Sequence, residues 1–138
     1  MTADGPRLIE VAARPAGGGH QMVSELATGD NHIKRTVAHR VRGEVRDSFD
    51  LVQHLRGIFI SAVREGYFRN REVLAPAEEL KSFHWMKILH DEDAIVPETV
   101  DLFTCLAWVI LIHSDAATLD EDYQRVLEME AAIVIDAP

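Results

Sequence analysis

The sequence predicts a mainly α-helical fold, a small bundle of four to five helices preceded by an irregular or short-strand N-terminal segment. Three observations favour this class. Apolar residues recur with a helical period between positions 48 and 65. Prolines at 76 and 97 stand where a helix could begin, and ten of the thirteen residues between Asp101 and Asp115 are apolar. The length of 138 residues, with 47% hydrophobic and 27% charged residues, suits one globular domain.

Residues 1–31 are expected to form a flexible or partly ordered N-terminal arm, and residues 32–138 a single helical domain. The stretch RLIEVAAR, from position 7, could be a short strand, which Pro15 and the three glycines after it would end. The glycine run lacks the Lys-Ser/Thr of a phosphate-binding loop. The first ten residues contain no apolar signal-peptide core, which predicts a cytoplasmic location.

Residues 33–45 fit either a helix or a strand. Ile33, Val37, Val41 and Val45 are four residues apart and would lie in one line along a helix. Read at every second position, the same stretch is rich in β-branched residues, as a strand would be, and Gly43 also argues against a helix. We slightly favour the helix because the apolar line continues into the next segment.

Two further helices are expected over residues 48–65 and 76–90. In the first, Phe49, Val52, Leu55 and Phe59 share one side of a helical wheel. Asp47 or Ser48 could cap its first turn, and the glycine at position 66 would end it. In the second, the first-turn proline is followed by two glutamates, which the helix dipole favours. Apolar residues spread around most of this second helix, so it would have contacts on several sides.

The apolar stretch 97–113 is predicted to be a helix with no polar face. Such a helix must lie at the centre of the bundle, or must also be covered by a second copy of the chain. The dimer interface would then include Leu106, Val109 and Ile110. Cys105, the single cysteine, is expected to be a buried small hydrophobe.

A last helix is expected from about Thr118, which could cap it. Glu130 falls in the middle of the inner face of this helix. Either the helix frays before Glu130 and AAIVIDA continues as a strand or tail, or the carboxylate is buried with a partner. We favour fraying.

The formal net charge of −9 is distributed unevenly. Residues 1–71 carry eleven Lys/Arg and eight Asp/Glu, whereas residues 72–138 carry three and fifteen. The acidic half either keeps the protein in solution or faces a protein partner, for which a basic protein would be suited. The residues expected to bind such a partner are Asp91, Glu92, Asp93, Asp120, Glu121 and Asp122.

A basic patch in the first half could bind an anion or a nucleic acid. It consists of Lys34, Arg35, Arg40, Arg42 and Arg46. The overall negative charge and the lack of interleaved aromatic residues argue against nucleic acid. We expect these side chains to pair with the acidic second half of the chain, or of a second copy. No membrane partner is expected, because no apolar run reaches the roughly 20 residues that a span needs.

Seven histidines raise the possibility of a metal site. The candidate ligands are His84, His90, His113 and Asp93, although their spacing matches no known metal motif. We assign no catalytic residue and no cofactor.

The function best supported by the sequence is that of a small acidic, non-enzymatic protein-binding module, regulatory or inhibitor-like, which acts either as a monomer or as a homodimer. The alternative is a metal-binding or enzymatic helical domain that uses His84, His90, His113 and nearby carboxylates.

Overall fold

The fold is a mixture of helices and antiparallel sheets, so the predicted helical bundle is wrong. The computed structural model describes residues 5, 11 and 14–138. The elements, in chain order, are α1 (His20–Thr28), α2 (His32–Arg42), β1 (His54–Ile60), β2 (Gly66–Phe68), the 3-10 helix η1 (Arg71–Glu79), β3 (Phe83–Ile88), β4 (Ile95–Val96), β5 (Ala107–His113), α3 (Ala116–Ala131) and β6 (Ile135–Asp136). The strand expected from position 7 lies mostly outside the described residues.

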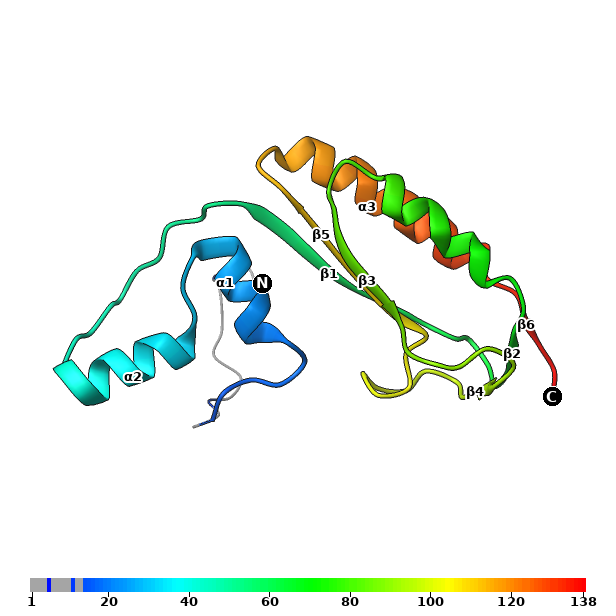
Figure 1. Ribbon diagram of the computed structural model, residues 1–138, viewed down its shortest axis with the longest axis horizontal. Coiled ribbons are helices and arrows are strands. Elements are labelled where there is room, and N and C mark those ends of the chain that lie inside the picture. The colour runs from blue at the N-terminus through cyan, green and yellow to red at the C-terminus, as the bar shows by residue number, and fades with distance from the viewer. Residues whose placement is uncertain (1–4, 6–10, 12–13) are drawn as a thin grey trace.

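The main sheet has three antiparallel strands in the order β1-β5-β3. Helix α3 lies along one face of this sheet with η1 beside it (Figure 1). Because side chains alternate along a strand, Ala107, Val109 and Leu111 of β5 point to the α3 side and are fully buried. They pack in the core with residues of β1, η1 and α3 such as Leu74 and Val126.

The opposite face of the main sheet is aromatic. Trp108 stacks on Phe59 with ring centroids 5.3 Å apart and meets Trp85 edge-on at 5.3 Å. The turn before α1 covers Trp108 closely: a Cβ added at Gly19, where φ is 73°, would lie 2.1 Å from the Trp108 ring. Only glycine fits this approach without strain. Helix α1 therefore lies on the face opposite α3.

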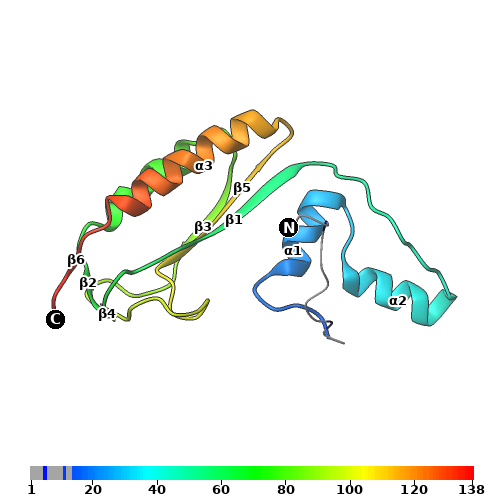
Figure 2. The same cartoon turned by 180° about the vertical axis from the view of Figure 1, so that it is seen from behind.

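A second, small sheet of order β4-β2-β6 lies at the end of the molecule that carries the C-terminus (Figure 2). Gly66 pairs with Val96, and Tyr67 with both Ile95 and Asp136. Arg64 donates to the main-chain carbonyl of Ile135, and Asn70 donates to that of Ala132. These bonds fix the chain end against the first half of the molecule.

The three segments predicted as helices at 48–65, 76–90 and 97–113 contain strands, turns and part of a 3-10 helix instead. The central strand β5 is flanked by β1 and β3 and is covered on both faces, so apolar residues occupy nearly every position. A run of this kind cannot be distinguished by periodicity from a buried helix. Strand β1, within 48–65, is an edge strand whose apolar residues Leu55, Ile58 and Phe59 also fit one side of a helical wheel. Pro76 lies inside η1, which ends at Glu79, and the aromatic-rich segment after it forms β3.

Two predicted helices are present. Helix α2 covers residues 32–42, with Gly43 as its left-handed C-terminal cap. Helix α3 begins slightly before the predicted start, because Asp115 and not Thr118 is its N-cap. It continues through Glu130, whose Oε1 accepts a hydrogen bond of 2.8 Å from the Ser61 N–H. The helix therefore does not fray before Glu130, whose partly buried carboxylate has a partner, and AAIVIDA continues into the strand β6. Among the described residues, no helix is long and apolar enough to cross a bilayer.

Candidate protein-docking surface

The two N-terminal helices form a hairpin whose turn is capped at both sides. Helix α1 ends at Thr28, and its C-cap Gly29 has φ 70° and an N–H that donates to the Glu25 carbonyl at 2.8 Å. Asn31 begins α2, and its Oδ1 accepts from the Lys34 N–H at 3.0 Å. A glycine C-cap followed within two residues by an asparagine N-cap sets a tight connection between the helices.

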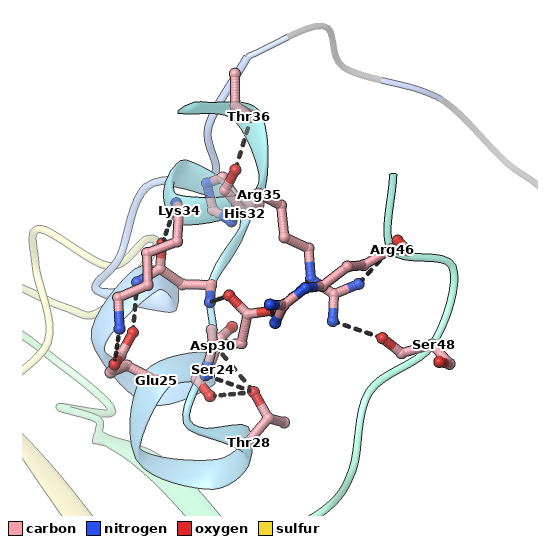
Figure 3. A network of polar contacts seen from close by, with 11 residues as sticks. Ser24, Glu25, Thr28, Asp30, His32, Lys34, Arg35, Thr36, Arg46 and Ser48 are labelled. Atoms are coloured by element: carbon pink, nitrogen blue, oxygen red, sulfur yellow. Dashed lines mark hydrogen bonds and ion pairs between the residues drawn. The ribbon is translucent and has the colours of Figure 1, made fainter. Parts of the chain in front are cut away.

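Two carboxylates hold this hairpin together (Figure 3). Glu25 accepts hydrogen bonds from the Asn31 amide at 2.7 Å and from the Lys34 ammonium. Asp30 accepts from the Asn31 N–H at 2.8 Å and from Arg35 Nε at 2.9 Å. The side chain of Asp30 is only 15% exposed, so its charge depends on these partners.

Arg35 extends this network to the segment that follows α2. Its Nη1 donates to the Arg46 carbonyl at 3.2 Å, and its Nη2 donates to the Ser48 carbonyl at 2.6 Å (Figure 3). The Arg46 guanidinium also lies 3.5 Å from Asp30. A planar guanidinium can hold a carboxylate and two carbonyls at once because its five N–H donors point in fixed directions.

The environment lowers the pKa of both carboxylates. For Glu25 the main cause is the hydrogen bond from the Lys34 ammonium. For Asp30, partial burial raises the pKa, but the Asn31 N–H and the Arg35 guanidinium outweigh it, and the net pKa is lowered. A lowered pKa in the folded state means that ionisation stabilises the fold above the unfolded-state pKa.

This predicts that the hairpin loosens in acid. The stabilisation is complete above the unfolded-state pKa of about 4 and is lost as the pH falls through the lower folded-state values. Amide hydrogen exchange of α2, corrected for intrinsic rates, should therefore speed up relative to the β5 core between pH 6 and pH 3. A Glu25→Gln/Asp30→Asn variant should show fast α2 exchange at both pH values. The exposed control Asp50→Asn should behave as the parent does, and an unchanged α2 at pH 3 would contradict the prediction.

Next to this network, apolar side chains are unusually exposed. Ile33, Val37 and Val41 of α2 are 46%, 52% and 73% exposed. Of the sixteen large exposed hydrophobic side chains in the described residues, seven lie between positions 33 and 52; the other four of these are Val45, Phe49, Leu51 and Val52. We call α2 together with residues 43–52 the docking surface. A groove of about 510 Å³ runs along it, lined by Ile33, Val37, Arg35 and Arg46 among others.

The basic patch belongs to this surface, but its charges are mostly paired locally. Lys34 pairs with Glu25, Arg35 and Arg46 with Asp30, and Arg42 with Glu44. The expected pairing with the acidic second half is not what the structure shows. Arg40 is exposed and, among the described residues, forms no ion pair. The arrangement is that of a salt-bridged, partly apolar surface.

The acidic residues proposed to bind a partner have separate roles. Asp91, Glu92 and Asp93 are exposed in the turn between β3 and β4. Asp120 pairs with Arg56, whose guanidinium lies 4.5 Å from the ring centroid of Tyr123. Glu121 is exposed. Asp122 is buried, and its Oδ2 accepts 2.8 Å hydrogen bonds from the N–H and the hydroxyl of Ser82.

The predicted metal ligands are engaged separately. His84 is exposed on β3. His90 Nε2 lies 3.0 Å from the Cys105 carbonyl, and His113 Nδ1 accepts from the Asp115 N–H at 3.0 Å. Asp93 lies 3.9 Å from Arg69. Within residues 5, 11 and 14–138, no three His, Cys, Asp or Glu side chains are arranged to hold a metal ion.

The structure also places the residues named for a dimer interface. Leu106, Val109 and Ile110 are fully buried inside the chain's own core. Cys105 is buried as expected; burial raises the pKa of its thiol, which donates to the Leu102 carbonyl at 3.1 Å. Sequence reasoning missed Phe49, Leu51 and Val52 as surface residues because it placed them on the inner face of a helix. The sequence reasoning identified the line of apolar residues on α2 but could not show that this line is exposed.

Comparison with known proteins gives one distant relative. No protein-family model and no solved structure matches the chain. The chain is 27% identical over 139 aligned positions to dapdiamide A synthase of Enterobacter agglomerans. The match covers 95% of this chain but only 32% of that protein. The chain thus spans about a third of the length of the curated protein it resembles.

Proposed function

We propose that this chain is a protein-binding module of a synthase that resembles dapdiamide A synthase, and that it acts in the cytoplasm. Its partner would be the polypeptide that corresponds to the other two thirds of such an enzyme, either covalently joined or separate. The similarity to dapdiamide A synthase, which extends over nearly the whole chain but a third of the relative, supports this proposal.

The observation that carries the proposal is the exposure of the docking surface. Each apolar side chain left in water forgoes a stabilisation of about 25 cal/mol per Å² of buried surface. Exposed apolar side chains that are concentrated in one region of a protein mark interaction sites more often than isolated ones do. Here three of the exposed apolar side chains lie on α2, in a hairpin whose turn is capped and whose charges are mostly paired. The segment that carries the other four is tied to this hairpin by Arg35, so the surface is ordered before a partner arrives. Such preorganisation lowers the entropic cost of binding.

The experiment is a chimera in which this chain replaces the matched region of dapdiamide A synthase. Hydrogen exchange of α2 is measured in the free chain and in the chimera. Contact with the rest of the synthase should slow α2 exchange by about tenfold or more, corresponding to about 1.4 kcal/mol of added protection. Formation of dapdiamide A is followed as a second readout.

Variants separate docking from folding. Val37→Glu in the chimera should abolish the added protection, because a carboxylate would be buried without a partner. The matched control is Val63→Glu, since Val63 is 84% exposed but lies in the β1–β2 connection, away from the docking surface. Equal exchange of α2 in the free chain and in the chimera would refute the proposed function.

A further inference from the structure

Residues 44–51 form a connection without helix or strand between α2 and β1 (Figure 1). All of these residues are exposed. Such a segment carries one main-chain N–H and one C=O group at every residue, and these groups require hydrogen-bond partners when they are covered. The hydrogen bonds that these main-chain groups already form within the chain show which side of the segment is in contact with the rest of the protein.

Two carbonyls of the segment and two N–H groups at its end are bonded toward the helical hairpin. The carbonyls of Arg46 and Ser48 both accept from the Arg35 guanidinium. The N–H groups of Val52 and Gln53 both donate to the Ala27 carbonyl, at 2.8 Å and 3.2 Å. In an extended chain the N–H and C=O of one residue point to the same side, and the next residue points to the opposite side. Two carbonyls two residues apart that reach one guanidinium fit this alternation.

By this alternation, the main-chain groups of the odd-numbered positions point to the side away from Arg35. Within the part of the chain that the structure describes, no hydrogen bond reaches the main chain of Val45, Asp47, Phe49 or Leu51. Apart from the carbonyls of Arg46 and Ser48, the main-chain groups of the even-numbered positions 44–50 are also without a hydrogen bond there. Three of these four side chains are apolar and more than half exposed. The segment therefore has the properties of an unpaired sheet edge: one side is fixed by Arg35, and the other offers a row of free donors and acceptors.

We infer that residues 45–51 accept a β-strand from the rest of the synthase. The added strand would pair with the free main-chain groups and place apolar side chains against those of Val45, Phe49 and Leu51. Strand addition of this kind obtains affinity from main-chain hydrogen bonds and specificity from alternate side chains. Arg35, held by Asp30, is the positioning residue that keeps the segment extended. This inference rests on the proposed function, because it names how the same surface is occupied.

The test uses the chimera and a pair of substitutions at one position. Asp47→Pro removes an N–H on the free side, while its ring suits an extended chain. Asp47→Ala keeps the N–H and removes only the side chain. Asp47→Pro should reduce the protection of residues 44–52 in the chimera by about tenfold, the effect of losing about 1.4 kcal/mol, whereas Asp47→Ala should change it by less than about twofold.

A second pair tests the positioning role of Arg35. Arg35→Lys keeps the positive charge but cannot hold Asp30 and two carbonyls at once. It should lower the protection of residues 44–52 in the chimera by about fivefold and leave exchange of the β5 core unchanged. Arg40→Lys, on the same helix but outside the network, should have no effect.

The outcomes separate this inference from the proposed function. If no residue between 33 and 52 gains protection in the chimera, both fail. If α2 gains protection while Val45, Asp47, Phe49 and Leu51 exchange as in the free chain and Asp47→Pro is neutral, strand addition is refuted and the proposed function stands. If the free chain protects these residues at high concentration and light scattering gives a mass of twice 15.5 kDa, a second copy is the occupant and the inference is overturned.

Discussion

Replacement of Asp122 by alanine is expected to lower the free energy of unfolding by about 3 kcal/mol. The carboxylate is 5% exposed and accepts both buried donors of Ser82, the N–H and the hydroxyl, at 2.8 Å. These bonds join α3 to the turn that precedes β3, so the loss would leave two buried donors without a partner. Urea unfolding followed by circular dichroism at neutral pH measures the change.

Two controls identify the buried bonds as the cause. Ser82→Ala removes only the hydroxyl and should cost about 1 kcal/mol. Asp120→Ala removes an acidic side chain two positions away that is 60% exposed in its pair with Arg56, and it should cost less than about 1 kcal/mol. If Asp122→Ala were no more destabilising than Asp120→Ala, the buried hydrogen bonds would not contribute as described.

Gly66→Ala is expected to disrupt the small sheet and to lower the free energy of unfolding by about 3 kcal/mol. A Cβ at this position would lie 1.9 Å from the Asp136 carbonyl oxygen and 2.7 Å from the Ile135 side chain. The main-chain oxygen cannot move without separating β6 from β2. Thermal unfolding and the rate of carboxypeptidase digestion of the chain end should both report this separation.

Gly57→Ala is the matched control for this substitution. It also lies in a strand, but its added Cβ would meet its nearest atom, Trp108 Nε1, at 3.4 Å, which is an ordinary contact. The control should change the free energy of unfolding by less than about 1 kcal/mol and leave the chain end protected from digestion. A Gly66→Ala protein with the parent's melting temperature and digestion rate would show that β6 does not pack as closely as the structure has it.

The sequence predicted α2 and α3, but not α1, and it failed where burial comes from distant segments. The prediction of α2 used its apolar line, which acts over a few residues, whereas Gly43, taken as an argument against the helix, is its C-cap. The start of α3 was predicted to within a few residues, although Asp115 and not Thr118 is its N-cap. The strand β5 is apolar at most positions because β1, β3, α3 and the N-terminal turn cover it, and no periodicity within residues 107–113 contains that information. The predicted interface residues Val109 and Ile110 were therefore apolar for a different reason, the interior of the chain's own sheet.

At the docking surface the error was the opposite one: residues predicted to be buried are exposed. Phe49 and Leu51 fit the inner face of a helix by spacing, yet they lie in an extended segment and are exposed. The basic residues near them were recognised, but their partners Glu25 and Asp30 lie in the N-terminal arm, which the sequence did not predict to be helical. Ion pairs across a turn can be predicted only when the secondary structure on both sides of that turn has been predicted.

Because Gly19 lies close to Trp108, the fluorescence of Trp108 reports whether the N-terminal hairpin is packed on the sheet. The indole is enclosed by Phe59, Trp85 and the glycine turn, and its Nε1 is buried without a hydrogen-bond partner in the described structure. Lifting the N-terminal hairpin from the sheet would expose this ring to water and shift its fluorescence emission to longer wavelength. Separation of the hairpin from the sheet can thus be followed in real time without a label.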